Sequence, residues 1–159
     1  MATAGANVLV RSAMWIERRL VNPIVDRILR SRLHPLLSGR LAVLSYEGRV
    51  SGERFSTPVL YERDGETIAV TTGRRAVTWW KNFRNPHPAT LWIGGEPIET
   101  TGQAITDADA IAAWTDELTH RSRLWRLLFE GGRVIGDSSA SPEERARAFV
   151  VVRFEPVSG

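Results

Sequence analysis

Glycine-centred turns punctuate the chain from residue 41 onward, and their spacing is the feature that most restricts the fold. Gly48–Gly52, Asp64-Gly65 and Gly94-Gly95 each separate two short runs rich in β-branched and aromatic residues. An Asp-Gly pair between two such runs is typical of a two-residue hairpin. Hairpins join antiparallel strands, whereas parallel strands need long crossover connections. The sequence therefore predicts an antiparallel sheet rather than a parallel α/β fold.

Six strands with helices among them are expected on this pattern. The expected strands are Leu41–Glu47, Arg54–Glu62, Glu66–Thr72, Ala89–Ile93, Pro97–Ile105 and Phe149–Glu155. The expected helices are Val77–Arg84, a longer one capped by Thr106 and running to about Phe129, and a third opening with the capping box Ser141-Pro142-Glu143-Glu144. Such a set predicts a mainly β protein with a small closed barrel, because closure removes exposed strand edges.

The first forty residues have a different character. Apolar residues recur there at helical spacing between arginines, which predicts two short N-terminal helices in residues 1–40 that belong to the same folded unit as the barrel of residues 41–159. Residues 8–40 hold seven arginines against Glu17 and Asp26, although the whole chain has a net charge of only +3. A basic amphipathic segment either packs its apolar stripe on the barrel, which we favour, or makes peripheral contact with an anionic membrane.

Composition removes several classes of chemistry. The chain has no cysteine, which excludes a disulfide scaffold and thiolate catalysis, and its three histidines, His34, His87 and His120, are too widely spaced to predict a metal site. No nucleophile motif of the Gly-x-Ser-x-Gly kind occurs, so no catalytic residue is assigned and any chemistry is expected from a bound cofactor. We expect a cytoplasmic protein. No nucleic-acid partner is expected, because the arginines are not interleaved with aromatic residues.

Three segments are candidates for holding a cofactor. Gly48-Arg49-Val50-Ser51-Gly52 can present backbone N–H groups and a guanidinium to an anion, or is merely a glycine-rich hairpin. Thr71-Thr72-Gly73-Arg74-Arg75 can bind an acidic tail, or is an exposed loop. Thr78-Trp79-Trp80-Lys81-Asn82 either packs its rings on the barrel or forms a flat pocket for a planar ring.

These motifs, taken in their order along the chain, resemble the deazaflavin-dependent nitroreductase family. The resemblance rests on Gly48-Arg49-x-Ser51-Gly52, Thr57-Pro58, Tyr61-x-Arg63-Asp64-Gly65, Trp79-Trp80-x-Asn82 and Asn85-Pro86, and it covers about residues 22 to 105. It implies a six-stranded antiparallel split β-barrel of the FMN-binding kind, with N-terminal helices and an inserted C-terminal helical segment. It also implies a reduced 8-hydroxy-5-deazaflavin coenzyme of the F420 type as hydride donor.

Carried over by position, the resemblance implies a set of cofactor-binding residues. These are Arg49, Val50, Ser51, Phe55, Ser56, Thr57, Thr71, Thr72, Gly73, Arg74, Thr78, Trp79, Trp80 and Asn82. The chain departs from the family at Val50, where a second lysine or arginine is common, and in its tyrosines, since Tyr46 and Tyr61 both precede the C-terminal helical region.

We therefore expect an oxidoreductase that passes a hydride from a reduced deazaflavin to a small-molecule acceptor: a quinone, a nitro compound or an activated alkene. One alternative is an FMN-binding barrel, which needs a phosphate pocket but no site for an acidic tail. A further alternative is a barrel without catalysis, which binds a small molecule or associates with a membrane. The resemblance also implies a homodimer.

Overall fold

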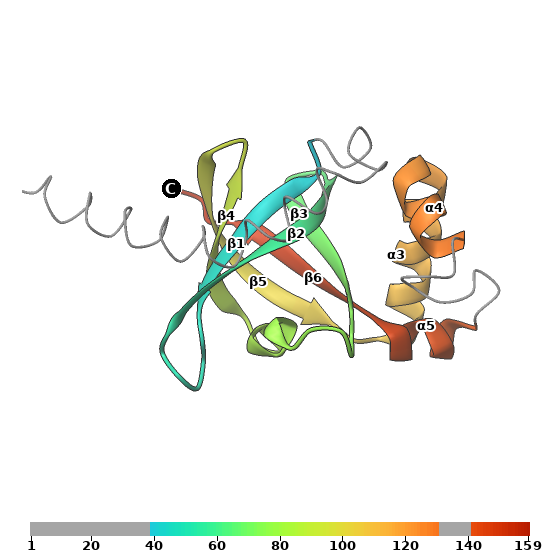
Figure 1. Ribbon diagram of the computed structural model, residues 1–159, viewed down its shortest axis with the longest axis horizontal. Helices are drawn as coiled ribbons and strands as arrows, with labels where there is room; N and C mark the ends of the chain where they lie inside the picture. Colours follow the sequence, from blue (N-terminus) through green and yellow to red (C-terminus); the bar gives the residue numbers. More distant parts are fainter. Residues whose placement is uncertain (1–38, 131–140) are drawn as a thin grey trace, which may run out of the picture.

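The computed structural model describes residues 39–130 and 141–159, and the helices expected in residues 1–40 fall almost wholly outside these ranges. The strands are β1 (Leu41–Glu47), β2 (Arg54–Asp64), β3 (Thr67–Gly73), β4 (His87–Ile93), β5 (Glu96–Ile105) and β6 (Phe149–Pro156). They form a closed antiparallel barrel in the order β1-β2-β3-β6-β5-β4 (Figure 1). The predicted fold class is confirmed.

The interior of the barrel is filled by every second side chain of the strands, as the two-residue period of a strand requires. Leu44 of β1 lies opposite Thr57 of β2 and Leu91 of β4, and Leu44 and Leu91 are fully buried. On the far side of the barrel, Ile68 of β3 pairs with Phe154 of β6, and both are also fully buried. Because successive side chains alternate between the two faces of a strand, the register shows which residues point into the barrel and which point outward.

Three α-helices among the described residues cover the outside of β3 and β6: α3 (Ala108–Arg121), α4 (Arg123–Glu130) and α5 (Pro142–Ala148). Figure 1 shows them gathered on one side of the barrel. Trp114 and Leu118 of α3 pack with Ala69 and Val151, which point outward from the two strands. Both faces of the middle of β3 and of the first half of β6 are therefore buried, which explains the apolar runs Ile68–Val70 and Phe149–Val152.

The long helix expected from Thr106 to about Phe129 is wrong in two respects. Its cap is Asp107, whose carboxylate accepts a hydrogen bond from the backbone N–H of Ala110 at 2.9 Å. It is also interrupted at Ser122, whose extended backbone (φ −141°, ψ 123°) ends α3. The carbonyl of Ser122 then accepts a bond from the N–H of Arg126 in α4. Serine often caps a new helix in this way.

The segment between β3 and β4 forms a short 3₁₀-helix, η1 (Trp79–Phe83), and not the α-helix expected at Val77–Arg84. Such helices are common as short connectors and repeat every three residues. Trp80 and Phe83 therefore share the buried side of η1, whereas Lys81 and Arg84 share the exposed side. The capping box of α5 at Ser141 and Glu144 is present as expected.

Candidate functional site

The turn between β1 and β2 is tied to η1 by the side chain of Arg49. Its Nε donates to the carbonyl of Asn82 at 2.7 Å, and its Nη2 donates to the carbonyls of Asn85 at 2.9 Å and Pro86 at 2.6 Å. The backbone N–H of Arg49 donates to Oδ1 of Asn82 at 3.0 Å. The guanidinium expected to hold a phosphate thus joins two segments of the protein, and it places Arg49 and Asn82 together at one end of the barrel.

The rest of the β1–β2 turn is held by short backbone and side-chain bonds. The N–H of Gly48 donates to the carbonyl of Glu53 at 2.8 Å, and Oγ of Ser51 accepts from the N–H of Glu53 at 3.2 Å. Gly52 adopts a positive φ of 67°, which favours glycine. Val50, at the tip, is fully exposed. The turn is a defined structure, and Ser51 contributes to it as an acceptor.

The three candidates on β2 are divided between the two faces of the strand. Phe55 lies opposite Tyr46 on the inner face and stacks on it with 5.6 Å between ring centroids. Thr57 shares that face, whereas Ser56 points outward, where its Oγ lies 2.8 Å from Oγ of Ser45. Burial raises the pKa of the Tyr46 phenol above that of a free tyrosine. Phe55 and Thr57 can therefore contribute to one surface, and Ser56 belongs to another.

Thr71 and Thr72 are likewise on opposite faces of β3. Thr71 is buried beneath α3, where its hydroxyl accepts a hydrogen bond from the indole N–H of Trp114 at 3.0 Å. Thr72 lies opposite Val150 on the inner face and is half-buried, and Gly73 ends the strand. Thr72 and Gly73 thus lead toward η1, while Thr71 anchors a helix on the outside.

Arg74 has the least satisfied polar group at this end of the barrel. Its backbone N–H donates to the carbonyl of Ala148 at 2.8 Å, and its Nε donates weakly to the carbonyl of Phe149 at 3.4 Å. Its guanidinium carbon lies 5.6 Å from the ring centroid of Trp80. Its Nη2 is buried and has no hydrogen-bond partner among the described residues. A buried cationic donor without an acceptor is costly, so this position suits an anionic ligand group.

The two tryptophans of η1 are core residues. Trp79 and Trp80 are only 9% and 4% exposed, and the indole N–H of Trp80 donates to the carbonyl of Arg74 at 3.1 Å. Trp79 meets Phe83 edge to face at 5.9 Å. Of the candidates on this segment, Thr78 is exposed and Asn82 is half-buried. Both rings therefore pack in the barrel core, while their assignment to a cofactor stays a prediction.

The structure brings Arg49, Asn82, Trp80 and Arg74 together around η1, and it separates Ser56 and Thr71 from them. Assignment of any of these residues to a cofactor stays a prediction. Within residues 39–130 and 141–159, no group of three histidine, aspartate or glutamate side chains is arranged to hold a metal ion. No helix in the described parts of the chain has the length and apolar character needed to cross a membrane.

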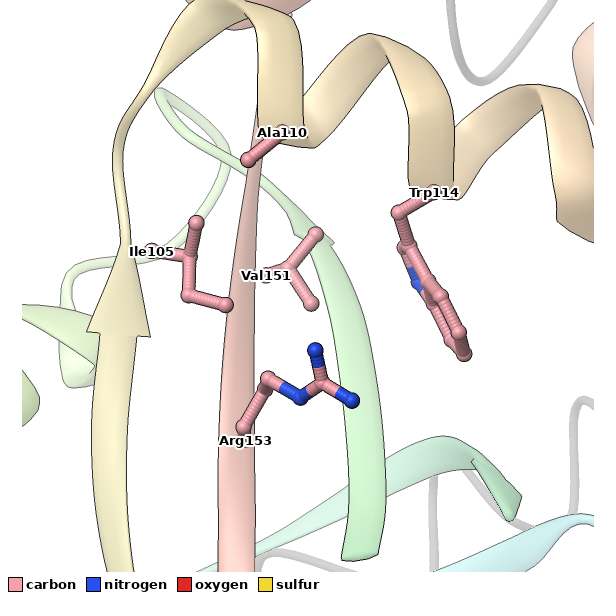
Figure 2. Close-up of a pocket in the computed structure, with 5 residues that line it drawn as sticks. All are labelled: Ile105, Ala110, Trp114, Val151 and Arg153. Carbon is pink, nitrogen blue, oxygen red and sulfur yellow. The ribbon is translucent and has the colours of Figure 1, made fainter. Parts of the chain in front are cut away.

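A cleft that no sequence motif indicated lies on the outer face of β5 and β6. A shallow opening of about 480 Å³ between Pro86 and Glu155 shares Ile105 and Arg153 with a smaller recess of about 50 Å³ beside α3. Figure 2 shows the Arg153 guanidinium extending toward Trp114 across this recess. Arg153 also pairs with Asp64. A single charged residue within the apolar run Phe149–Phe154 was the available signal.

Comparisons with protein families and with curated proteins find no match. Among solved structures, a candidate pyridoxamine 5′-phosphate oxidase from Listeria innocua aligns over 84% of this chain and 93% of its own, with 17% identity and a TM-score of 0.51. HutZ, the heme storage protein from Vibrio cholerae, aligns over 88% of this chain and 92% of its own, with 11% identity and a TM-score of 0.50.

An F420-H2-dependent reductase aligns over 72% of this chain and 93% of its own, with 12% identity and a lower TM-score of 0.47. At such identities the likeness to the Listeria innocua and Vibrio cholerae proteins concerns the fold. The chain therefore has a split β-barrel fold, which it shares with these two proteins.

Proposed function

We propose that the chain binds a flavin-type cofactor at the η1 end of the barrel and acts as an oxidoreductase. The leading candidate is reduced 8-hydroxy-5-deazaflavin, which would supply a hydride for a quinone, a nitro compound or an activated alkene. The protein's own contribution is to bind and orient the two molecules and to exclude water between them. No side chain of the chain is required to take part in a covalent step.

Arg74 is the observation that carries this proposal. Its buried Nη2 lacks an acceptor among the described residues, and a phosphate or carboxylate of a cofactor supplies one. Trp80 flanks the guanidinium and holds the Arg74 carbonyl through its indole N–H, so the arginine is positioned before any ligand binds. Three candidate residues within four positions of Arg74 are at least partly accessible, namely Thr72, Gly73 and Thr78. A donor that is already placed loses little entropy on binding.

Two further observations support a redox cofactor. The first is that motifs in the turn, in β2 and in η1 resemble those of deazaflavin-dependent enzymes. Two of these motifs are in direct contact, because Arg49 is hydrogen-bonded to Asn82. The Listeria innocua protein with the same fold bears the name of an oxidase of a phosphorylated compound. Both features favour a ligand that combines a ring with a phosphate.

FMN is the alternative cofactor, and Val50 is the residue that favours it. Where a second cation would help to hold an acidic coenzyme tail, the chain has a fully exposed valine. Arg49, the neighbouring cation, donates to three backbone carbonyls. FMN needs a phosphate contact such as Arg74 but no tail site.

Binding without catalysis is the second candidate function. It is favoured by Trp79 and Trp80, whose rings fill the barrel core and leave less aromatic surface for an isoalloxazine or deazaflavin ring. HutZ, which shares the fold, is named as a heme storage protein. A barrel of this kind would hold a ligand without passing electrons through it.

Absorbance and fluorescence titrations of the full chain with oxidised deazaflavin and, separately, with FMN distinguish the cofactors. For the favoured cofactor, the reduced form is then mixed with menadione in a stopped-flow instrument, with and without protein. An enzyme accelerates the transfer of a hydride from the cofactor to the quinone, which takes up a solvent proton to give the hydroquinone. Binding with an unchanged rate supports a storage protein. Absence of binding to both at about 50 μM, an affinity weaker than about 6 kcal/mol, contradicts the proposal.

A further inference from the structure

The η1 end of the barrel carries a concentration of positive charge. Residues 73–86 contain Arg74, Arg75, Lys81 and Arg84 and no acidic residue. The adjoining turn and the start of β2, residues 47–55, add two arginines and two glutamates. Arg49 bonds these two segments together, so their charges lie on one end of the molecule. We refer to residues 47–55 and 73–86 as the basic end.

The exposed cations of the basic end are held in a defined arrangement. Lys81 lies in the last turn of η1 and Arg84 caps its C-terminus, and both residues are exposed. Trp80 and Phe83 fix η1 in the barrel core. Arg54 and Arg75 are also exposed. The Arg84 guanidinium lies over the Trp80 ring at 5.4 Å, as that of Arg74 does at 5.6 Å, but of the two residues only Arg74 has a buried nitrogen without a partner among the described residues.

Apolar side chains project from the same end. Among the described residues only three large apolar side chains are exposed, namely Val50, Phe55 and Val157, and the first two belong to the β1–β2 hairpin. Val50 is fully exposed at the tip, while Phe55 is 38% exposed and rests on Tyr46. The hydrogen bonds of Arg49 hold the tip firmly against η1. The basic end therefore presents an exposed apolar tip on the same end of the molecule as exposed cations.

We infer that the basic end docks on an anionic lipid surface, with Val50 inserted among the headgroups and the exposed cations paired with lipid phosphates and carboxylates. Arginine and lysine near such a surface each contribute to binding, and apolar insertion adds an attraction that salt does not screen. A soluble polyanion would satisfy the same cations but would give Val50 no apolar environment. The hairpin tip therefore favours a bilayer over a nucleic acid or a free phosphate. The inference does not depend on the proposed cofactor.

The chain has no native cysteine, so a single fluorescent label can be placed at the tip. We would label Val50→Cys in the full chain with an environment-sensitive dye and add vesicles of phosphatidylcholine with or without phosphatidylserine. The label at position 50 is expected to shift to the blue only with phosphatidylserine. Val157→Cys, labelled identically at another exposed valine, is expected to show no shift. Absence of a shift at position 50 overturns the inference, even if the chain binds vesicles through its arginine-rich first forty residues.

Unlabelled variants test the energetic contributions by vesicle co-sedimentation. Val50→Ser should weaken binding about five- to ten-fold, as expected for partial burial of a valine. The double variant Arg75→Gln, Lys81→Gln should lose about five-fold for each charge removed. Arg123→Gln, Arg126→Gln on α4 is the matched control and should bind like wild type. Two results would overturn the inference: equal binding of wild type and Val50→Ser, or equal affinity for vesicles and for soluble polyphosphate. Either would show that the basic end binds polyanions in general.

Discussion

Arg49 joins two segments that lie more than thirty residues apart in the sequence. Its hydrogen bonds go to one side-chain oxygen and three backbone carbonyls. Because η1 contributes Trp80 and Phe83 to the barrel core, Arg49 connects the position of the turn to the packing of the core. The arginine therefore has a structural role at the candidate site.

Replacement of Arg49 by alanine should accordingly destabilise the protein. Loss of its charge-assisted bonds at an exposed position is expected to lower the free energy of unfolding by about 1 to 2 kcal/mol. For a chain of this size the melting temperature should fall by about 2 to 8 °C. Differential scanning calorimetry measures both, with Arg54→Ala, an exposed arginine in the same hairpin, as the control. Equal melting temperatures for the two variants would show that the bonds of Arg49 contribute no stability.

Thr71 and Thr72 are adjacent, yet the pleat of β3 gives them separate roles. Thr71→Val keeps the shape but leaves the buried Trp114 indole N–H without its acceptor, so we expect a loss of about 1 to 3 kcal/mol in the free energy of unfolding. Thr72→Val removes a hydroxyl from the inner face near η1 and should affect cofactor affinity more than stability. Urea unfolding and cofactor titration of both variants separate these effects. The reverse pattern would place Thr71, and not Thr72, at the cofactor.

At the scale of elements, the strands were predicted well because their signals are local. Turn glycines and alternating burial bracket β1 to the residue, and the capping box marks α5. The end of α3 was not predicted, since Ser122 becomes a cap only through its place among α3, α4 and Arg40. For η1, the pattern indicated a short helix but not its three-residue repeat, which places Trp80 and Phe83 on one side of it.

Gly102 of β5 makes the room that η1 requires. A Cβ at this position would lie 2.6 Å from Cε1 of Phe154 and 2.7 Å from Cδ1 of Phe83, which are both fully buried. Gly102→Ala should therefore push η1 outward and lower the free energy of unfolding by about 1 to 3 kcal/mol. Chemical denaturation measures the change, and Thr101→Ala on the exposed face is expected to stay within about 0.5 kcal/mol of wild type. Unchanged stability of Gly102→Ala would mean that η1 is not seated against β5.

At the scale of the whole molecule, the hairpins predicted that the sheet closes into a barrel. They did not predict which strands pair to close it. Pairing of β1 with β4 and of β3 with β6 joins strands that are distant in sequence and carry no local signal. The sequence likewise showed the motifs of the candidate site, but it did not show on which face of its strand each residue would lie. Thr71 and Ser56 were included because the resemblance was carried over by position, and the register places them on the outer face.

The stability of the whole barrel is expected to depend on alkaline pH through Tyr46. Burial raises the pKa of its phenol in the folded state, so its contribution to stability is complete below the pKa of an unfolded tyrosine and is lost as the pH rises through the folded value. Stability should therefore fall above about pH 10. The chain has only two tyrosines, so the phenolate absorbance can be resolved. Tyr46→Phe should remove the late-titrating component, and its persistence would contradict the assignment to Tyr46.

The most direct test of the central claim compares Arg74 with its neighbour Arg75 by titrating each variant with the cofactor. If the buried Nη2 of Arg74 receives an anionic group, Arg74→Gln should weaken binding of deazaflavin or FMN by about ten- to a hundred-fold, which is the loss of one charge-assisted bond. Arg75→Gln, which removes an exposed charge beside it, should change the affinity by less than about five-fold at physiological salt. Equal affinities for wild type and Arg74→Gln would contradict a cofactor site at this end of the barrel.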